Sequence, residues 1–167
     1  AFAAVNRIDD FAYMPQQNIA HAMTALMAQN KGAKKTDRIK AAFRCGMKIE
    51  LFYGIFIFFV CFFLAHPLMQ LFSNDPVVCK HGVTYLKLIS LMYLFPAVTN
   101  GVQGYFRGIG DLKITLISSF VNMSVRVIFA AVLVFHFSLQ IEALPFSYLA
   151  GWIGMLLAEV PLLLRKF

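Results

Sequence analysis

Four polar side chains follow Pro15 within an otherwise apolar stretch: Gln16, Gln17, Asn18 and His21. Gln17 and His21 are four residues apart and share one face of a helix, and Asn18 lies beside them. If this helix crosses a membrane, these groups must find partners away from lipid. They can donate hydrogen bonds to a neighbouring helix, or they can line a water-filled cavity that holds a substrate. Both readings place the polar stripe toward the interior of a helix bundle.

Arg126 stands at the centre of another apolar stretch, residues 112–137. An Arg at mid-membrane costs about 2.5–3.5 kcal/mol on insertion scales. We therefore expect the guanidinium to face the interior and to pair with an acid or with carbonyls at a helix end. Asn122 lies one turn earlier on the same face and can share that network. Arg126 then serves either a structural pairing or the binding of a substrate or coupling ion.

Pro96 interrupts a third apolar stretch, and Asn100, Gly101 and Gly104 follow it. A proline there frees the carbonyl of Met92, and the two glycines allow another helix to approach closely. Broken helices near the midplane mark hinges and binding sites in transporters. The same features also fit a plain packing kink, and both readings stay open.

Carboxylates are the usual carriers of protons and sodium ions in membranes, and this chain has few of them. The sequence places none at a clear midplane position: Glu50 lies near an inner interface, and Glu159 lies near the inner end of the last apolar stretch. Asp10 is the candidate for ion coupling, because Arg7 lies one turn away on the same helix.

The residue patterns of enzymes are missing from the sequence. It contains no glycine-rich phosphate loop, no helix with two His at metal-binding spacing and no nucleophile motif. We therefore expect neither an enzyme, nor a metal site, nor a bound cofactor.

The elements that carry these residues have the length and composition of membrane spans. Of the 167 residues, 60% are hydrophobic and 14% are charged, whereas a soluble domain has about 25% charged residues. A span needs roughly 20 apolar residues to cross the hydrocarbon. We predict an all-α, polytopic membrane helix bundle with five transmembrane helices, at about residues 2–30, 38–66, 76–106, 112–137 and 143–164.

Charge is distributed unevenly between the two ends of these predicted spans. One end collects most of the basic residues: Lys31, Lys34, Lys35, Arg38, Lys40, Arg44, Lys48, Arg107, Lys113, Arg165 and Lys166. By the positive-inside rule this end is cytoplasmic, so the amino end lies outside and the carboxyl end inside. The basic run 31–48 then contacts anionic lipid headgroups, and no nucleic acid is expected as a partner.

The start of the chain leads to one further expectation. The chain opens with Ala1 and shows no targeting signal. A first residue that must lie outside, with no signal to carry it there, suggests that other spans precede it. We therefore expect these residues to be part of a longer membrane protein.

Two motifs make the chain similar to a known family. Residues 6–11 (Asn-Arg-Ile-Asp-Asp-Phe), Pro15 and residues 28–33 (Ala-Gln-Asn-Lys-Gly-Ala) resemble the second helix of the carboxyl half in MATE (multidrug and toxic compound extrusion) transporters. Residues 106–111 (Phe-Arg-Gly-Ile-Gly-Asp) resemble the turn after the tenth span of that family. The resemblance covers essentially the whole chain, and related segments also fall at residues 73–76 and 125–127.

The resemblance implies spans eight to twelve of a twelve-span transporter, in which two six-helix lobes related by pseudo-twofold symmetry enclose a central cavity. Members of the family expel organic cations in exchange for sodium ions or protons. Residues 1–167 would then be part of the carboxyl-terminal lobe. The implied partners are organic cations, membrane lipids and the amino-terminal lobe of the same protein, in a bacterial plasma membrane.

One position departs from the family's pattern. Some bacterial members carry a coupling carboxylate in the tenth span, and counting back from Arg107 places Pro96 there. Asn100 is polar but cannot ionise. If the protein couples transport to a cation, we expect the acid to lie in the amino-terminal lobe or in the seventh span.

Together these features predict a secondary multidrug exporter that works by alternating access. Its cavity would be lined by polar and soft side chains: Tyr13, Met14, Gln17, Asn18, His21, Asn100 and Arg126. Two alternatives stay open. A lipid-linked oligosaccharide flippase of the same superfamily would need several basic residues to hold a pyrophosphate. A non-transporting membrane scaffold would lack the polar stripe.

Overall fold

The computed structural model describes residues 2–72, 74–137 and 143–166. Nearly all of this part is helical, and it contains no strand. Seven helices follow one another in these ranges: α1 Phe2–Gly32, α2 Thr36–Phe63, α3 Ala65–Gln70, α4 Pro76–Ser90, α5 Leu94–Gly108, α6 Leu112–Phe137 and α7 Ala143–Leu164. The predicted all-α class is confirmed.

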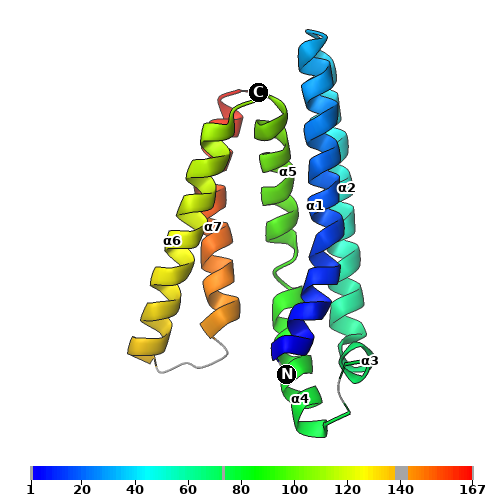
Figure 1. Ribbon diagram of the computed structural model, residues 1–167, viewed down its shortest axis with the longest axis vertical. Helices are drawn as coiled ribbons and strands as arrows, with labels where there is room; N and C mark the ends of the chain where they lie inside the picture. Colours follow the sequence, from blue (N-terminus) through cyan, green and yellow to red (C-terminus); the bar gives the residue numbers. More distant parts are fainter. Residues whose placement is uncertain (1, 73, 138–142, 167) are drawn as a thin grey trace.

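Helix α5 lies at the centre of the arrangement (Figure 1). It packs against α1 and α2 on one side and meets the hairpin of α6 and α7 on the other. Two glycines bring α5 close to α1: a Cβ at Gly104 would stand 2.9 Å from the Ala20 carbonyl oxygen, and a Cβ at Gly108 would stand 2.9 Å from the Thr24 carbonyl oxygen. The Thr24 hydroxyl also donates to the Gly104 carbonyl at 3.2 Å. The close approach predicted at Gly104 is confirmed.

The third predicted span is broken into two helices. α4 ends at Ser90, α5 begins at Leu94, and the two are bent by 47°. Pro96 lies within the first turn of α5, where the amide that proline lacks has no partner within the helix. The expectation that Pro96 frees the Met92 carbonyl is wrong, because this carbonyl accepts a hydrogen bond from the Phe95 amide at 3.0 Å.

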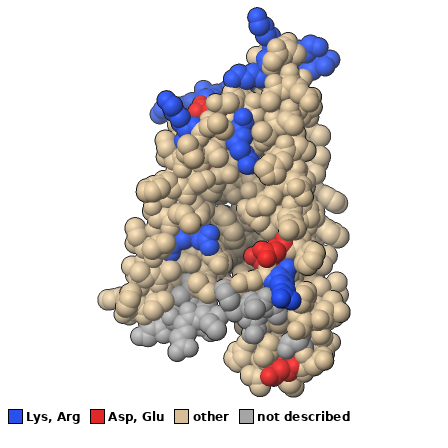
Figure 2. Space-filling view, viewed as in Figure 1, with Lys and Arg blue, Asp and Glu red and all other residues tan. Residues whose placement is uncertain are grey.

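Most of the basic residues gather at one end of the bundle (Figure 2), where the α1–α2 turn, the α5–α6 turn and the end of α7 lie (Figure 1). Lys31 donates to the Ile109 carbonyl, and Lys166 forms an ion pair with Asp111. These contacts tie three segments that are far apart in the sequence. The grouping of charge that the sequence pattern requires is therefore present in the fold.

Three helical ranges are long and apolar enough to cross a membrane: Thr36–Phe63, Leu112–His136 and Leu144–Leu164. The bent pair α4–α5 also meets the criterion when it is counted as one span. α1 is not among them, since polar residues interrupt its apolar run. Within the described residues this gives three or four spans, so the predicted count of five is not confirmed.

Large apolar side chains cover the outside of the bundle. On α2, Phe52 is 75% exposed, and on α6, Phe120 and Phe135 are 75% and 88% exposed. Such surfaces are costly in water and favourable in hydrocarbon. Together with the spans, they identify an integral membrane protein.

Candidate functional site

The polar run after Pro15 divides between two sides of α1. Gln16 is completely buried, whereas Gln17, Asn18 and His21 are exposed. Helix α1 continues through Pro15, so these side chains keep regular helical spacing. Gln16 alone among the four turns into the described bundle, and the other three lie on a side that the described chain leaves open.

The open side of α1 also includes two other predicted site residues. Asp10 and Met14 are exposed, and their spacing places them in line with Gln17, Asn18 and His21. We call these five residues the open face of α1. Arg7, one turn before Asp10, is exposed as well, and no ion pair joins the two among the described side chains.

Gln16 connects α1 to the break between α4 and α5. Its Nε2 donates to the Tyr93 carbonyl at 3.3 Å, and the Ala97 amide donates to the same carbonyl. Tyr93 is the residue just before α5, so the helix break supplies the acceptor. The Gln16 amide oxygen Oε1 is buried and has no hydrogen-bond partner in the described part of the chain.

Tyr13 and Asn100 join α1 to α5. The Tyr13 hydroxyl donates to the Asn100 amide oxygen Oδ1 at 3.2 Å. Asn100 is buried, and its Nδ2 finds no partner among the described residues. Two residues that the sequence suggested for separate reasons therefore meet in one contact.

Glu50 of α2 lies close to these residues, although it was not predicted as a site residue from the sequence. Its side chain is completely buried, and neither carboxylate oxygen has a hydrogen-bond partner in the described structure. Glu50 is near enough to Tyr13 for the two to interact electrostatically. One turn further along α2, a Cβ at Gly54 would stand 3.1 Å from the Ala97 Cβ and 3.5 Å from the Gln16 Nε2. Glu50 is thus enclosed by α1, α2 and α5.

We call this group the inner polar core, and it consists of Tyr13, Gln16, Glu50, Asn100 and the Tyr93 carbonyl. Buried polar atoms without partners are rare and costly in proteins. This core contains four of them beside a helix break, namely Gln16 Oε1, the two Glu50 carboxylate oxygens and Asn100 Nδ2, so most are oxygens. Oxygen atoms of amides, carboxylates and carbonyls are the ligands that hard cations prefer. The core can therefore hold a proton or a monovalent cation. Among the described residues, no three His, Cys, Asp or Glu side chains gather to hold a metal ion.

Arg126 lies elsewhere, within the α6–α7 hairpin. Its guanidinium carbon is 4.0 Å from the centre of the Tyr148 ring. Its aliphatic stem packs over Gly151, where a Cβ would stand only 2.3 Å from the Arg126 Cγ. Asn122, one turn earlier, points to the Met155 sulfur at 3.5 Å. The described residues thus give Arg126 an aromatic partner in place of the expected acid or carbonyl, and they do not bring it to the open face of α1.

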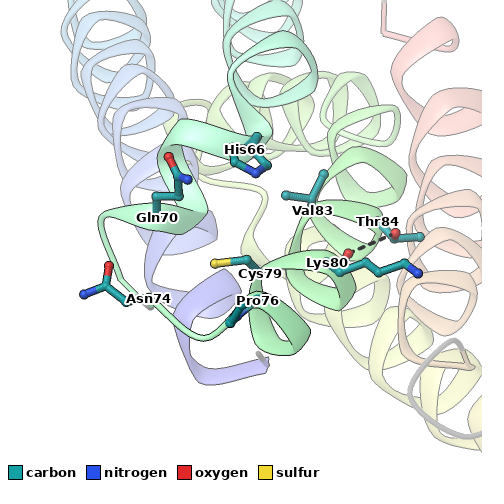
Figure 3. Close-up of a pocket in the computed structure, with 8 residues that line it drawn as sticks. All are labelled: His66, Gln70, Asn74, Pro76, Cys79, Lys80, Val83 and Thr84. Carbon is teal, nitrogen blue, oxygen red and sulfur yellow. Dashed lines mark hydrogen bonds between the residues drawn. The ribbon is translucent and has the colours of Figure 1, made fainter.

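A separate pocket of ≈ 470 Å³ lies between α3 and α4, at the end opposite the basic residues (Figures 1 and 3). Figure 3 shows His66 and Gln70 on one wall and Lys80 and Thr84 on the other. The Thr84 hydroxyl donates to the Lys80 carbonyl at 3.2 Å. No residue of the open face or of the inner polar core lines this pocket.

A row of small residues could have revealed Glu50 in the sequence. Gly46, Glu50 and Gly54 are four residues apart on α2, and all three are buried. Small residues mark the side of a span that packs against another helix. An acid in such a row lies on the same side of the helix as the glycines and is therefore buried in the bundle with them. On α7, Gly151 and the completely buried Glu159 are eight residues, about two turns, apart and so lie on one side of the helix.

Comparison with known proteins places these features in a family. The family model described as MatE matches residues 1–132 of the chain. The probable multidrug resistance protein NorM of Thermotoga maritima is 25% identical over 150 residues, which cover 89% of this chain and 31% of that protein. The FAD transporter of Shewanella oneidensis is 26% identical over 120 residues, which cover 70% of this chain and 26% of that protein. The chain therefore spans less than a third of the length of these two relatives.

A solved structure has the same arrangement of helices. It is described as the inward-facing conformation of a multidrug resistance MATE family transporter of the MOP superfamily, and it matches with a TM-score of 0.84. The match covers 98% of this chain and 38% of that chain, at 17% sequence identity. At this identity the likeness concerns the fold.

Proposed function

Because the chain belongs to the MatE family, we propose that it is part of a secondary active transporter that exports organic cations or other xenobiotics in exchange for sodium ions or protons. Relatives named as multidrug resistance proteins and as an FAD transporter support a role in transport. In this proposal, two lobes rock about a central cavity by alternating access. The observation that carries the proposal is the open face of α1.

The open face is unsuited to lipid and suited to an aqueous cavity. Gln17, Asn18 and His21 are exposed polar groups in the middle of a long helix, whereas α2 and α6 expose mostly apolar side chains. In hydrocarbon each unsatisfied polar group costs several kcal/mol. We therefore place the open face toward the amino-terminal lobe, with water and substrate between them. Met14 adds a polarizable contact for aromatic cations.

The inner polar core supports the open face from behind. Tyr13 is half-buried, and its bond to Asn100 connects the cavity wall to α5, just after the helix break. A change in the bend between α4 and α5 would therefore move the wall. We include Tyr13 and Asn100 in the substrate site as residues that position this wall, and we assign Arg126 to the α6–α7 hairpin.

Glu50 is better placed than Asp10 to carry the coupling ion. Asp10 is exposed, while Glu50 is enclosed with the amide of Gln16 and the broken helix. Binding of a proton or a sodium ion at Glu50 would remove an uncompensated charge from the core. Its connection through Tyr13 to the cavity wall provides a route by which the ion can influence the substrate.

The proposal also fixes an orientation. By the positive-inside rule, the end that carries Lys31 and Lys166 faces the cytoplasm of a bacterial cell, where it contacts anionic lipids. The amino end of the chain then lies outside. The alternative of a lipid-linked oligosaccharide flippase has less support, because Arg126 stands apart from the open face.

Dye efflux in membrane vesicles tests the substrate wall in the longer transporter that contains these residues. We expect Gln17→Leu to slow the ion-driven efflux of a fluorescent organic cation by about fivefold, the loss of roughly one hydrogen bond. Gln29→Leu is the matched control, because Gln29 is an exposed amide of α1 near the basic end. Equal efflux by the Gln17→Leu protein and the wild type would remove the open face from the substrate path.

The same vesicles test ion coupling. We expect Glu50→Gln to reduce efflux to the rate seen without an ion gradient, because the amide cannot bind and release the ion. Asp37→Asn, the same chemical change at an exposed acid of α2, is the control and is expected to leave efflux unchanged. Binding of the dye to the purified protein is expected to persist in the Glu50→Gln variant. Gradient-dependent efflux by this variant would exclude Glu50 as the coupling acid.

A further inference from the structure

A second row of polar side chains runs between α5, α6 and α7, apart from the inner polar core. α6 and α7 are antiparallel neighbours (Figure 1). Their contacts pair residues at intervals of about one turn: Arg126 with Gly151, Asn122 with Met155, and Ser118 with Glu159. The row thus leads from the centre of α6 toward the basic end and finishes at a carboxylate.

Glu159 is enclosed as completely as Glu50. Its side chain has 0% exposure, and neither carboxylate oxygen has a hydrogen-bond partner in the part of the chain that the structure describes. Ser118 of α6 and Gln103 of α5 lie near enough to the Glu159 carboxylate to interact with it electrostatically. Ser118 is itself 1% exposed, so the carboxylate and a hydroxyl share a site closed to solvent.

The neighbouring side chains leave oxygens available around Glu159. The Ser118 hydroxyl donates to the Thr115 carbonyl at 3.1 Å, so its lone pairs can face a ligand. The Gln103 Nε2 donates to the Ser119 hydroxyl at 3.4 Å. The hydroxyl of Thr115, one turn from Ser118, is buried and has no partner among the described residues. Side chains of three helices therefore meet at this place: Gln103 of α5, Ser118 of α6 and Glu159 of α7.

The charge of Arg107 acts on Glu159 from a distance. As the structure describes them, the two side chains are not in contact as an ion pair. The Arg107 Nε donates to the Gln103 carbonyl at 3.4 Å, and no ion pair joins Arg107 to Glu159 in the described structure. On α7 the next basic group, Lys166, pairs with Asp111 instead. The charged residues of α6, Lys113 and Arg126, form no ion pair with Glu159 among the described side chains.

An ionised carboxylate that forms no ion pair is expensive in such a place, because burial removes the water that would stabilise its charge. A bound cation removes this cost. We propose that Glu159, together with the oxygens of Ser118 and Gln103, forms a second buried site for a monovalent cation, either a proton or a sodium ion. The site lies in the α5–α6–α7 seam and goes beyond the proposed function, which assigns coupling to Glu50.

Binding measurements on the purified full-length transporter test this site without any transport assay. One measurement counts the radioactive sodium ions bound per protein. The other follows the infrared band of protonated carboxyl groups while pH is varied. If the cation is sodium, Glu159→Gln lowers the count by one; if it is a proton, Glu159→Gln removes one carboxyl group from the band that persists at neutral pH, where exposed acids such as Asp37 are ionised.

Two further variants separate the site from general damage. Ser118→Ala is expected to weaken sodium binding by about fivefold, or to shift the carboxyl band, because it removes one polar neighbour and keeps the carboxylate. Asp37→Asn and Ser124→Ala are the controls, because they make the same chemical changes at an exposed acid and elsewhere on α6. Both controls are expected to bind as the wild type does.

The proposal is overturned if Glu159→Gln keeps both the wild-type sodium count and the wild-type carboxyl band. It is also overturned if Arg107→Gln creates a bound sodium ion or a protonated carboxyl group that the wild type lacks, since Glu159 would then be the ionised partner of Arg107 in the wild type. Failure of dye efflux in the wild-type protein would instead contradict the proposed function. The two results are distinguishable because binding is measured with neither dye nor gradient.

Discussion

Arg126 illustrates how a single residue can keep a positive charge within an apolar hairpin. The ring of Tyr148 attracts the guanidinium, and the glycine at 151 makes room for its stem. A desolvated cation–π contact contributes about 2 kcal/mol, while an Arg at mid-membrane costs about 2.5–3.5 kcal/mol. The contact offsets most of the cost but not all of it. Stability alone therefore does not explain the presence of the Arg.

Replacement of Arg126 by Leu tests this balance. We expect the Arg126→Leu protein to assemble and to gain about 1 kcal/mol in stability, because the burial cost that it removes exceeds the contact that it loses. Thermal unfolding in detergent gives the change, with Arg126→Lys as the control that keeps the charge. A clear loss of stability in Arg126→Leu would show that the guanidinium has stronger contacts than the Tyr148 ring provides.

At the residue scale, the sequence predicted which side chains are polar members of the site better than it predicted the direction in which each one points. It selected Tyr13 and Asn100, which meet, and it placed Gln16 with Gln17, which the helix separates. It placed Glu50 near an interface and did not predict that it is enclosed by three helices. Residue type reveals that a group is costly in lipid. The direction of its side chain depends on how each helix is rotated about its axis against its neighbours. In this sequence, the row of small residues on α2 indicates which side of that helix faces the bundle.

At the scale of elements, the contact between α1 and α5 depends on glycine. The Cβ that Gly104 lacks would come within 2.9 Å of a backbone oxygen, which cannot move aside as a flexible side chain can. The two helices would have to move apart, and this movement would also separate the residues of the inner polar core. Closeness of the two backbones is therefore a condition for the Tyr13–Asn100 bond.

Two glycine-to-alanine changes on the paired helices test this contact. Gly32, the last residue of α1, has nothing within 4 Å of a Cβ position, so Gly32→Ala is expected to be neutral or slightly stabilising. Gly104→Ala is expected to lower the free energy of unfolding by about 1–3 kcal/mol relative to the Gly32→Ala protein, because the added methyl group overpacks the contact between α1 and α5. Thermal unfolding of both proteins measures the difference. Equal stability would mean that α1 and α5 separate without cost.

The elements also show what sequence patterns can locate. Runs of apolar residues predicted α2, α6 and α7 nearly in full, because the thickness of a bilayer fixes the length of a span. The break in the third span was predicted at Pro96 and lies three to five residues earlier, at residues 91–93. A proline is compatible with the first turn of a new helix, so it indicates that a break is near but not where the previous helix ends.

At the scale of the whole molecule, the fold brings the basic segments to one end, and the Asp75 cap of α4 lies toward the other. If the protein crosses the membrane as proposed, these ends face different compartments. Residues 33 and 74 are exposed at the two ends and can report the side on which each lies.

Single cysteines at these positions test the orientation. In a protein whose Cys45, Cys61 and Cys79 are replaced by Ala, we expect Asn74→Cys to react with a membrane-impermeant maleimide added to intact cells. Ala33→Cys is expected to react only after the membrane is opened. Reaction of both cysteines from the same side would contradict the arrangement of spans on which the transport proposal depends.

The exposure of α6 has a consequence for the evolution of this chain. Its outward side chains, such as Phe120 and Phe135, have little within the described residues to fit against, so one apolar residue can replace another there at little cost. Its inward side chains, such as Asn122 and Arg126, fit individual partners on α7. In related proteins, the amino acids at the inward positions of α6, which recur every three or four residues, would therefore be conserved. The outward positions between them would vary among apolar residues.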